Sequence, residues 1–152
     1  MTTDRIEKHV TLKAPIDRVW RALTDAKQFG TWFEVAIEGP FVAGQPASGT
    51  ITTKGYEHLR FAIEVERLDR PAGVFAFRWH PFAVDPALDY RAEPMTLVEL
   101  VVRETPGGTQ LTVTESGFAA LPAARRELAL RMNDGGWAQQ GKNLAAYLGE
   151  LA

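Results

Sequence analysis

Hydrophobic and polar residues alternate along the first segment of the chain. From Arg5 to Lys13, apolar side chains return at two-residue spacing, which is typical of a strand with one buried face. At Ala14 the spacing changes to that of a helix, and Pro15 suits a first helical turn because no helical hydrogen bond needs its missing N–H. The pattern predicts a short helix over residues 15–23 and a second one over residues 26–30.

The middle of the chain has the pattern of successive strands. Clusters of Gly, Pro and Asp separate six segments that favour extended structure. Two connections, residues 70–73 and 106–108, are short and rich in turn residues, so the strands that flank each are expected to pair as hairpins. The predicted strands are Val35 to Ile37, Gly49 to Lys54, Leu59 to Leu68, Val74 to His80, Thr96 to Glu104 and Thr109 to Ser116.

Helical spacing returns in the last segment, from about Ala123 to Leu151. The positions with this spacing are Leu128, Met132, Gly136, Trp137, Leu144, Leu148 and Leu151. Three glycines, at 135, 136 and 141, each lower the stability of a helix by about 1 kcal/mol relative to alanine, so their presence needs an explanation. Close packing against a sheet or space left for a ligand would supply it. A helix broken near Asp134 and Gly135 is the alternative.

This order of elements predicts an α+β fold. A strand, two short helices, about six strands and one long helix can bury all their apolar faces if a curved antiparallel sheet wraps around the C-terminal helix. The chain has 152 residues, of which 45% are hydrophobic, which suits one domain over residues 1–152. Sequential antiparallel pairing is the simplest topology.

The inward faces of the predicted strands carry many large side chains. Ten aromatic rings are available for one interior, which favours a partly open pocket lined by rings, with ordinary core packing as the other interpretation. The residues predicted to bind a ligand are Trp32, Phe33, Phe61, Ile63, Phe75, Phe77, Trp79, Val98, Leu100, Val113, Met132, Gly136 and Trp137.

One acidic residue falls on an inward face. Glu115 lies two residues beyond Val113, near the end of a strand. It is expected either at the rim, in water or bonded to a turn, or buried, where it would be a candidate acid or base for catalysis. The long connection from Pro81 to Pro94 is either a lid or a surface excursion.

Composition excludes several classes of function. Seventeen basic and nineteen acidic residues give a net charge of −2, so neither nucleic acid nor an anionic membrane is the expected partner. No apolar run is long enough for membrane insertion and no export segment begins the chain, so a cytoplasmic location is predicted. The absence of cysteine excludes thiolate metal sites, the three histidines lack metal-binding spacing, and no cofactor motif is present. Neither a metal nor a cofactor is therefore expected.

Four short segments carry a resemblance to a known family. They are Ala14 to Thr24, Trp32 with Phe33, Ser116 to Phe118, and Gly136 with Trp137. The chain resembles the START-like superfamily of helix-grip proteins, and within it the bacterial single-domain branch of homologues of the heat-shock-protein-90 ATPase activator. The resemblance implies an antiparallel sheet of six to seven strands gripping a long C-terminal helix around an apolar cavity.

The family spans several functions, so three hypotheses stay open. The first is non-enzymatic binding or carriage of a small hydrophobic molecule, lipid-like or aromatic, between the sheet and the C-terminal helix. The second is a cyclase-like or hydrolase-like enzyme that uses Glu115, or a residue of the 81–94 connection, as its acid or base. The third is an interaction module, either a chaperone regulator or a homodimer. We expect the first, because the inward aromatic faces and the helix glycines both favour it.

Overall fold

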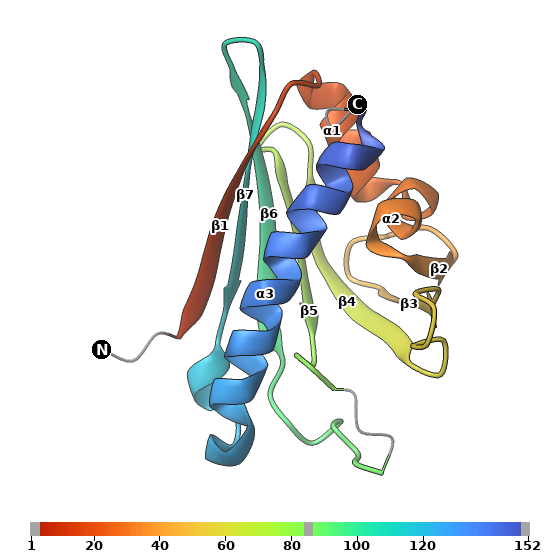
Figure 1. Cartoon of the computed structure of the whole chain (residues 1–152), viewed down its shortest axis with the longest axis vertical. Coiled ribbons are helices and arrows are strands. Elements are labelled where there is room, and N and C mark those ends of the chain that lie inside the picture. Colours follow the sequence, from red (N-terminus) through yellow and green to blue (C-terminus); the bar gives the residue numbers. More distant parts are fainter. Residues whose placement is uncertain (1–3, 84–86, 150–152) are drawn as a thin grey trace.

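A seven-stranded antiparallel sheet curves around one long helix in the computed structural model, which describes residues 4–83 and 87–149 (Figure 1). The spatial order of the strands is β1-β7-β6-β5-β4-β3-β2. The strands are β1 (Arg5–Leu12), β2 (Val35–Glu38), β3 (Pro46–Ile51), β4 (Arg60–Asp69), β5 (Val74–Trp79), β6 (Thr96–Thr105) and β7 (Gly108–Ser116). The helices are α1 (Ile16–Thr24), α2 (Ala26–Phe33), the short 3-10 helix η1 (Phe118–Ala120) and α3 (Ala123–Tyr147). The α+β helix-grip fold is therefore confirmed.

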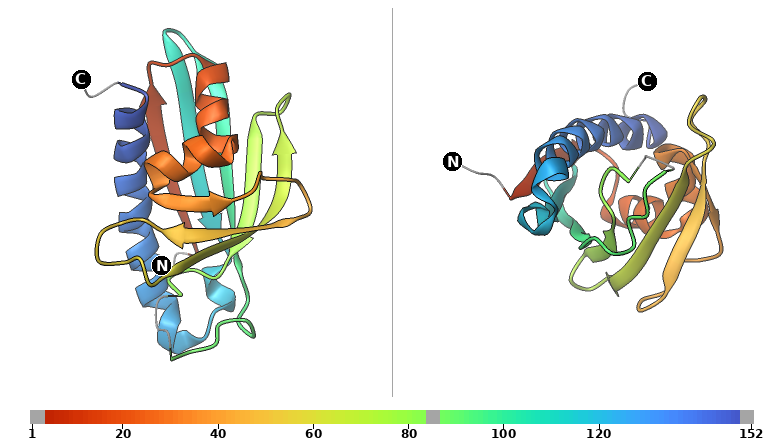
Figure 2. Two further views of the ribbon diagram at one scale, coloured as in Figure 1. Left: turned by 90° about the vertical axis from the view of Figure 1, so that its right-hand side faces the viewer. Right: turned by 90° about the horizontal axis from the view of Figure 1, so that it is seen from below.

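The sheet is strongly bent, as the two further views show (Figure 2). One cause is a shift of register in β4 between Val65 and Arg67, where the extra residue Glu66 bulges from the ladder with β5. The shift changes which face each residue takes, so Leu68, rather than Arg67, packs on the core beyond it. The alternation predicted over residues 59–68 holds before the bulge and changes at it.

The two short helices close one end of the sheet. Asp25 caps α2 by accepting a hydrogen bond from the N–H of Lys27 at 3.1 Å. The indole N–H of Trp32 donates to the carbonyl oxygen of Ala22 at 2.8 Å, which ties α2 to α1. At the end of α2, Glu34 takes a left-handed conformation with φ of 66°, and the chain turns directly into β2. Helix α2 thus extends three residues beyond the predicted end.

Helix α3 runs unbroken across the concave face of the sheet (Figure 1). The predicted alternative of a break near Asp134 is not observed. The buried residues of α3 are Ala129, Trp137 and Leu144, whereas Leu128 and Met132 are exposed. The helix ends at Tyr147, before the predicted end at about Leu151, because Leu148 and Gly149 form a turn; residues 150–151 of the predicted helix lie outside the described residues.

A single cluster of buried side chains fills the space between the sheet and the helices. It contains the inward residues of the strands, in agreement with the predicted faces, and the largest fully buried rings are Phe29, Phe75, Phe77 and Phe118. Three polar residues, Thr96, Thr109 and Glu115, are also buried. Among the described residues, no helix combines the length and the apolar character needed to cross a membrane.

The three glycines of α3 differ in what surrounds them. A Cβ added at Gly135 or Gly136 would meet nothing within 4 Å, whereas at Gly141 it would lie 3.1 Å from Cγ2 of Val10. Gly135→Ala and Gly136→Ala are each expected to raise the free energy of unfolding by about 0.5–1 kcal/mol, because alanine favours the helix and nothing opposes it. Gly141→Ala should gain less, since β1 must yield. Urea denaturation of the three variants measures the difference, and an equal gain at all three sites would contradict it.

Candidate ligand-binding cleft

Glu115 is the centre of a buried network of hydrogen bonds. Its side chain is fully buried, and the indole N–H groups of Trp79 and Trp137 each donate to one of its oxygens at 2.8 Å. The hydroxyl of Thr96 donates at 2.6 Å, and the side-chain amide of Asn133 lies 3.1 Å from both oxygens. No ion pair involves Glu115 among the described residues, so four neutral donors surround it.

Strand register and helix periodicity bring these donors together. Trp79 pairs with Thr96 across β5 and β6, and Glu115 pairs with Val98 across β6 and β7. Asn133 and Trp137 are four residues apart on α3, which places both on the face turned toward the sheet. Glu115 therefore connects β5, β6, β7 and α3.

The network leaves the faces of the two indoles available for packing. Trp79 and Trp137 are stacked, with ring centroids 5.7 Å apart and an angle of 28° between the planes. Their N–H edges point inward to Glu115. The ring of Phe33 lies 6.2 Å from Trp79 and 6.1 Å from Trp137, so three rings from three elements meet at one place.

Two clefts open beside these rings. The larger has a volume of about 260 Å³ and is lined by Phe33, Ile51, Leu59, Arg60, Phe61, Ala62, Trp79, His80, Phe82, Ala83 and Asn133. The smaller has a volume of about 170 Å³ and is lined by Phe33, Trp79, Asn133, Gly136, Trp137 and Gln140. Because Phe33, Trp79 and Asn133 border both, the two clefts are neighbours, and together they are called the aromatic cleft below.

The structure distributes the predicted ligand-binding residues over four environments. Phe33, Phe61, Trp79, Gly136 and Trp137 line the aromatic cleft. Trp32, Leu100 and Val113 border a void of only about 10 Å³ in the core. Ile63, Phe75, Phe77 and Val98 are buried in the core. Met132 is 45% exposed and does not belong to any of these linings.

Sequence reasoning missed the polar residues of the cleft. Arg60, His80, Asn133 and Gln140 line it, and none of them is among the residues predicted to bind a ligand. Spacing on α3 could have identified Asn133, since it lies one helical turn before Trp137. The link from Asn133 to Glu115 could not be inferred without knowing how α3 lies on the sheet.

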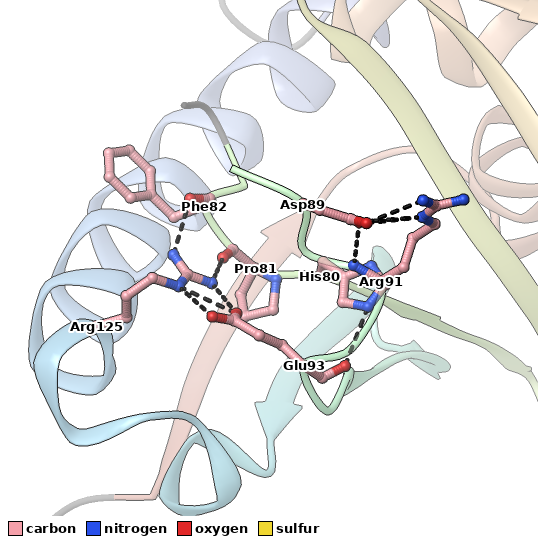
Figure 3. A network of polar contacts seen from close by, with 7 residues as sticks. All are labelled: His80, Pro81, Phe82, Asp89, Arg91, Glu93 and Arg125. Atoms are coloured by element: carbon pink, nitrogen blue, oxygen red, sulfur yellow. Dashed lines mark hydrogen bonds and ion pairs between the residues drawn. The ribbon is translucent and has the colours of Figure 1, made fainter. Parts of the chain in front are cut away.

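The connection between β5 and β6 borders the aromatic cleft and is fastened to α3 by Arg125 (Figure 3). The guanidinium donates to both carboxylate oxygens of Glu93, at distances from 2.7 to 3.1 Å, and to the carbonyl oxygens of Pro81 and Phe82 at 3.1 Å. It also lies over the ring of Tyr90, with Cζ 4.7 Å from the centroid. Arg125 therefore holds both ends of this connection.

A second ion pair lies within the same connection. The side chain of Arg91, and then its backbone N–H, donate to Asp89 and lower the pKa of that carboxyl group to about 2. His80 belongs to the same polar network, and its Nε2 lies 3.1 Å from the carbonyl oxygen of Glu93 (Figure 3). Whether the connection acts as a lid stays a prediction, because part of it, residues 84–86, lies outside the described residues.

A larger depression of about 770 Å³ lies elsewhere, between the α1–α2 junction and β2. It contains none of the predicted site residues, and its lining includes exposed backbone such as Gly39 and Pro40. The aromatic cleft is the better candidate site because rings and a buried polar network form it. Within residues 4–83 and 87–149, no group of three acidic or histidine side chains is placed to hold a metal ion.

Comparison with solved structures places the chain in a known fold. The crystal structure of DynU16, a protein of the dynemicin biosynthetic locus, is 24% identical with a TM-score of 0.74 and is matched over 97% of this chain and 48% of its own. The chain thus spans about half the length of DynU16. Protein MLL2253 from Mesorhizobium loti is 21% identical with a TM-score of 0.74, over 97% of this chain and 98% of that one. A protein from Arthrobacter aurescens is 15% identical with a TM-score of 0.75, over 96% and 86%.

These likenesses establish the fold and leave the ligand open. No curated protein matches the sequence. The family model described as activator of Hsp90 ATPase homolog 1-like protein matches residues 13–149, which include both short helices, the whole of α3 and every residue that lines the aromatic cleft. The chain therefore belongs to the family of activator of Hsp90 ATPase homolog 1-like proteins.

Proposed function

We propose that this protein binds a small, mostly apolar molecule with a flat ring in the aromatic cleft. The observation that carries the proposal is the fixed pair of indoles, Trp79 and Trp137, whose N–H edges are held by Glu115. Fixing the edges orients the ring faces before a ligand arrives, so less side-chain freedom is lost on binding. Phe33 and Phe61 add apolar wall on the side of α2 and β4.

The shape of α3 supports the same proposal. Gly136 lines the cleft, and a Cβ at this position would meet no protein atom within 4 Å. Glycine at this position lowers the stability of the helix by about 1 kcal/mol relative to alanine, but it keeps space open beside Trp137. Each cleft is smaller than the roughly 300–1,000 Å³ of typical ligand sites, so movement of Phe33, which borders both clefts, would be needed to join them around a larger ligand.

The surroundings of Glu115 favour binding over acid–base catalysis. Both of its oxygens already accept hydrogen bonds from side chains, and the group is fully buried behind the indoles. A catalytic acid or base must come within hydrogen-bond reach of the reacting atom. A cyclase-like or hydrolase-like activity would therefore need another residue, and the chaperone-regulating and homodimer hypotheses stay predictions.

Blocking the cleft tests the proposal. Gly136→Leu places a side chain in the cleft, whereas Gly135→Leu makes the same change one residue earlier on the same helix, outside the cleft lining. The probe is 2-methoxynaphthalene, a neutral flat molecule, and its binding is measured by equilibrium dialysis. We expect Gly136→Leu to weaken binding at least tenfold and Gly135→Leu to change it less than twofold. Equal affinity in the two variants, or no binding to the unmodified protein, would overturn the proposal.

A further inference from the structure

Three residues that line the aromatic cleft donate their hydrogen bonds to Glu115, so these donors are directed away from the cleft. Trp79, Trp137 and Asn133 all line the cleft, and each directs its N–H groups to the same buried carboxyl group. We infer that the cleft selects ligands that themselves carry a hydrogen-bond donor, a hydroxyl or N–H on the flat ring, and that Oδ1 of Asn133 accepts it. This inference rests on the proposed function.

The orientation of Asn133 follows from the chemistry of its partner. Nδ2 lies 3.1 Å from both oxygens of Glu115, so the amide turns its NH₂ toward the carboxyl oxygens that accept its hydrogen bonds. The amide is planar, with oxygen and nitrogen on opposite branches, so Oδ1 is directed away from Glu115. Among the described residues, no group donates to this oxygen. Asn133 borders both parts of the cleft and is partly exposed.

The other polar side chains of the cleft do not replace the missing donors. Gln140 donates weakly to the carbonyl oxygen of Phe33 at 3.4 Å and accepts from Asn143 at 3.0 Å, so both ends of its amide are engaged. His80 lies 3.1 Å from the carbonyl oxygen of Glu93. Because a carbonyl oxygen only accepts, Nε2 donates to it, so this N–H of His80 is engaged as well.

Arg60 is the remaining donor of the lining, and it is engaged at the rim. Its guanidinium donates to both oxygens of Glu38 at 3.2 Å and to the hydroxyl of Thr50 at 2.9 Å. The donors of the lining are therefore engaged by Glu115, by Glu38 and Thr50, or by backbone carbonyl oxygens, and Oδ1 of Asn133 is left as an acceptor. A ligand that only accepts hydrogen bonds would leave Oδ1 of Asn133 desolvated and unpaired, which is unfavourable.

Two probes of the same ring differ only in the donor. We expect 2-naphthol, which has a hydroxyl, to bind about tenfold more tightly than 2-methoxynaphthalene, which is the effect of one hydrogen bond of about 1.4 kcal/mol. Equilibrium dialysis of both probes against the full chain measures the ratio. The inference is overturned if the ratio is near one while Gly136→Leu still weakens the binding of both probes at least tenfold, in which case the proposed function stands. If neither probe binds, both the proposed function and the inference fail.

Substitution of Asn133 assigns the preference to one atom. Asn133→Leu keeps the approximate size of the side chain and removes the acceptor, so the ratio of the affinities for 2-naphthol and 2-methoxynaphthalene should fall below twofold. Gln139→Leu is the matched control, because Gln139 is exposed on the same helix and outside the cleft lining, and its ratio should stay near tenfold. A tenfold preference that survives in Asn133→Leu would contradict the role of Oδ1.

Glu115 is a positioning residue in this scheme, and Glu115→Gln tests that role. Glutamine brings an NH₂ group to the centre of the network, to which Asn133 can turn its Oδ1. The amide would then present its NH₂ to the cleft, and the preference for 2-naphthol should be lost while 2-methoxynaphthalene still binds. If Glu115 only stabilised the fold, Glu115→Gln would weaken the binding of both probes equally and leave the ratio near tenfold, and this result would overturn the positioning role. If the variant does not fold, the ratio measured with Asn133→Leu decides.

Discussion

Replacing Glu115 with leucine is expected to lower the free energy of unfolding by about 4 kcal/mol. Leucine fills a similar volume but accepts no hydrogen bond. The indole N–H groups of Trp79 and Trp137, the hydroxyl of Thr96 and the amide of Asn133 would lose their acceptor together. An unsatisfied buried donor costs about 1–3 kcal/mol, and the partly exposed amide would recover some of that from water.

Urea denaturation followed by tryptophan fluorescence measures the loss, because two of the reporting indoles contact the site itself. Glu104→Leu is the matched control: Glu104 is exposed on the neighbouring strand β6, and its replacement should change stability by less than about 0.5 kcal/mol. Glu115→Gln should fall between the two, since glutamine keeps one acceptor. A leucine variant within 1 kcal/mol of the unmodified protein would show that the donors find other partners.

The second large effect is expected at Arg125 and should be local. Arg125→Ala would leave Glu93 and the carbonyl oxygens of Pro81 and Phe82 without their shared donor. The ion pair that is lost is mostly buried, because the side chains of Arg125 and Glu93 are only 17% and 19% exposed. Phe82 also has a φ of 48°, a left-handed conformation that is strained for a bulky residue and that the bond from Arg125 helps to hold. Without Arg125, residues 80–83 should relax away from α3.

Hydrogen exchange at the amide of Glu93, which donates to the carbonyl oxygen of Tyr90 at 2.9 Å, reports this opening. We expect exchange roughly thirtyfold faster in Arg125→Ala, equivalent to about 2 kcal/mol for breaking a mostly buried pair. Arg125→Lys should recover little, because an ammonium group cannot reproduce the planar fork. Arg131→Ala, an exposed position on α3, is the control. Unchanged exchange at Glu93 in Arg125→Ala would show that other contacts hold the connection.

Periodicity predicted most of the fold because the buried faces dominate it. The two-residue alternation runs from Thr96 to Val102 in β6 and through the whole of β7, and both strands have the predicted buried residues. Prediction was less accurate where turn geometry decides. The start of β3 at Pro46, three residues before the expected Gly49, is set by its pairing with β4, in which Ala47 lies opposite Ile63. That pairing is a long-range contact and leaves no periodic trace in so short a strand.

The sequence predicted part of the site, and the error arose from the angular positions of residues around α3. Leu128, Met132 and Gly136 share one stripe, but Met132 is about 140° around the helix from Trp137, and Asn133 is about 40° from it. The inward face therefore follows Ala129, Asn133 and Trp137, and Met132 is exposed. Parity placed Glu115 inward correctly, but its four partners come from β5, β6 and α3, so their convergence needed the assembled sheet.

The pairing of β1 with β7 determines the order in which the chain can fold during synthesis. Arg5 lies opposite Ser116, so the first strand has no neighbour in the sheet until the last strand has left the ribosome. Until then Ile6 and Leu12, which are buried in the finished core, are exposed to water on a nascent chain. Closing a loop of this length is slow compared with forming the hairpins between consecutive strands. The growing polypeptide therefore passes through a stage in which β1 is available to chaperones and to mispairing.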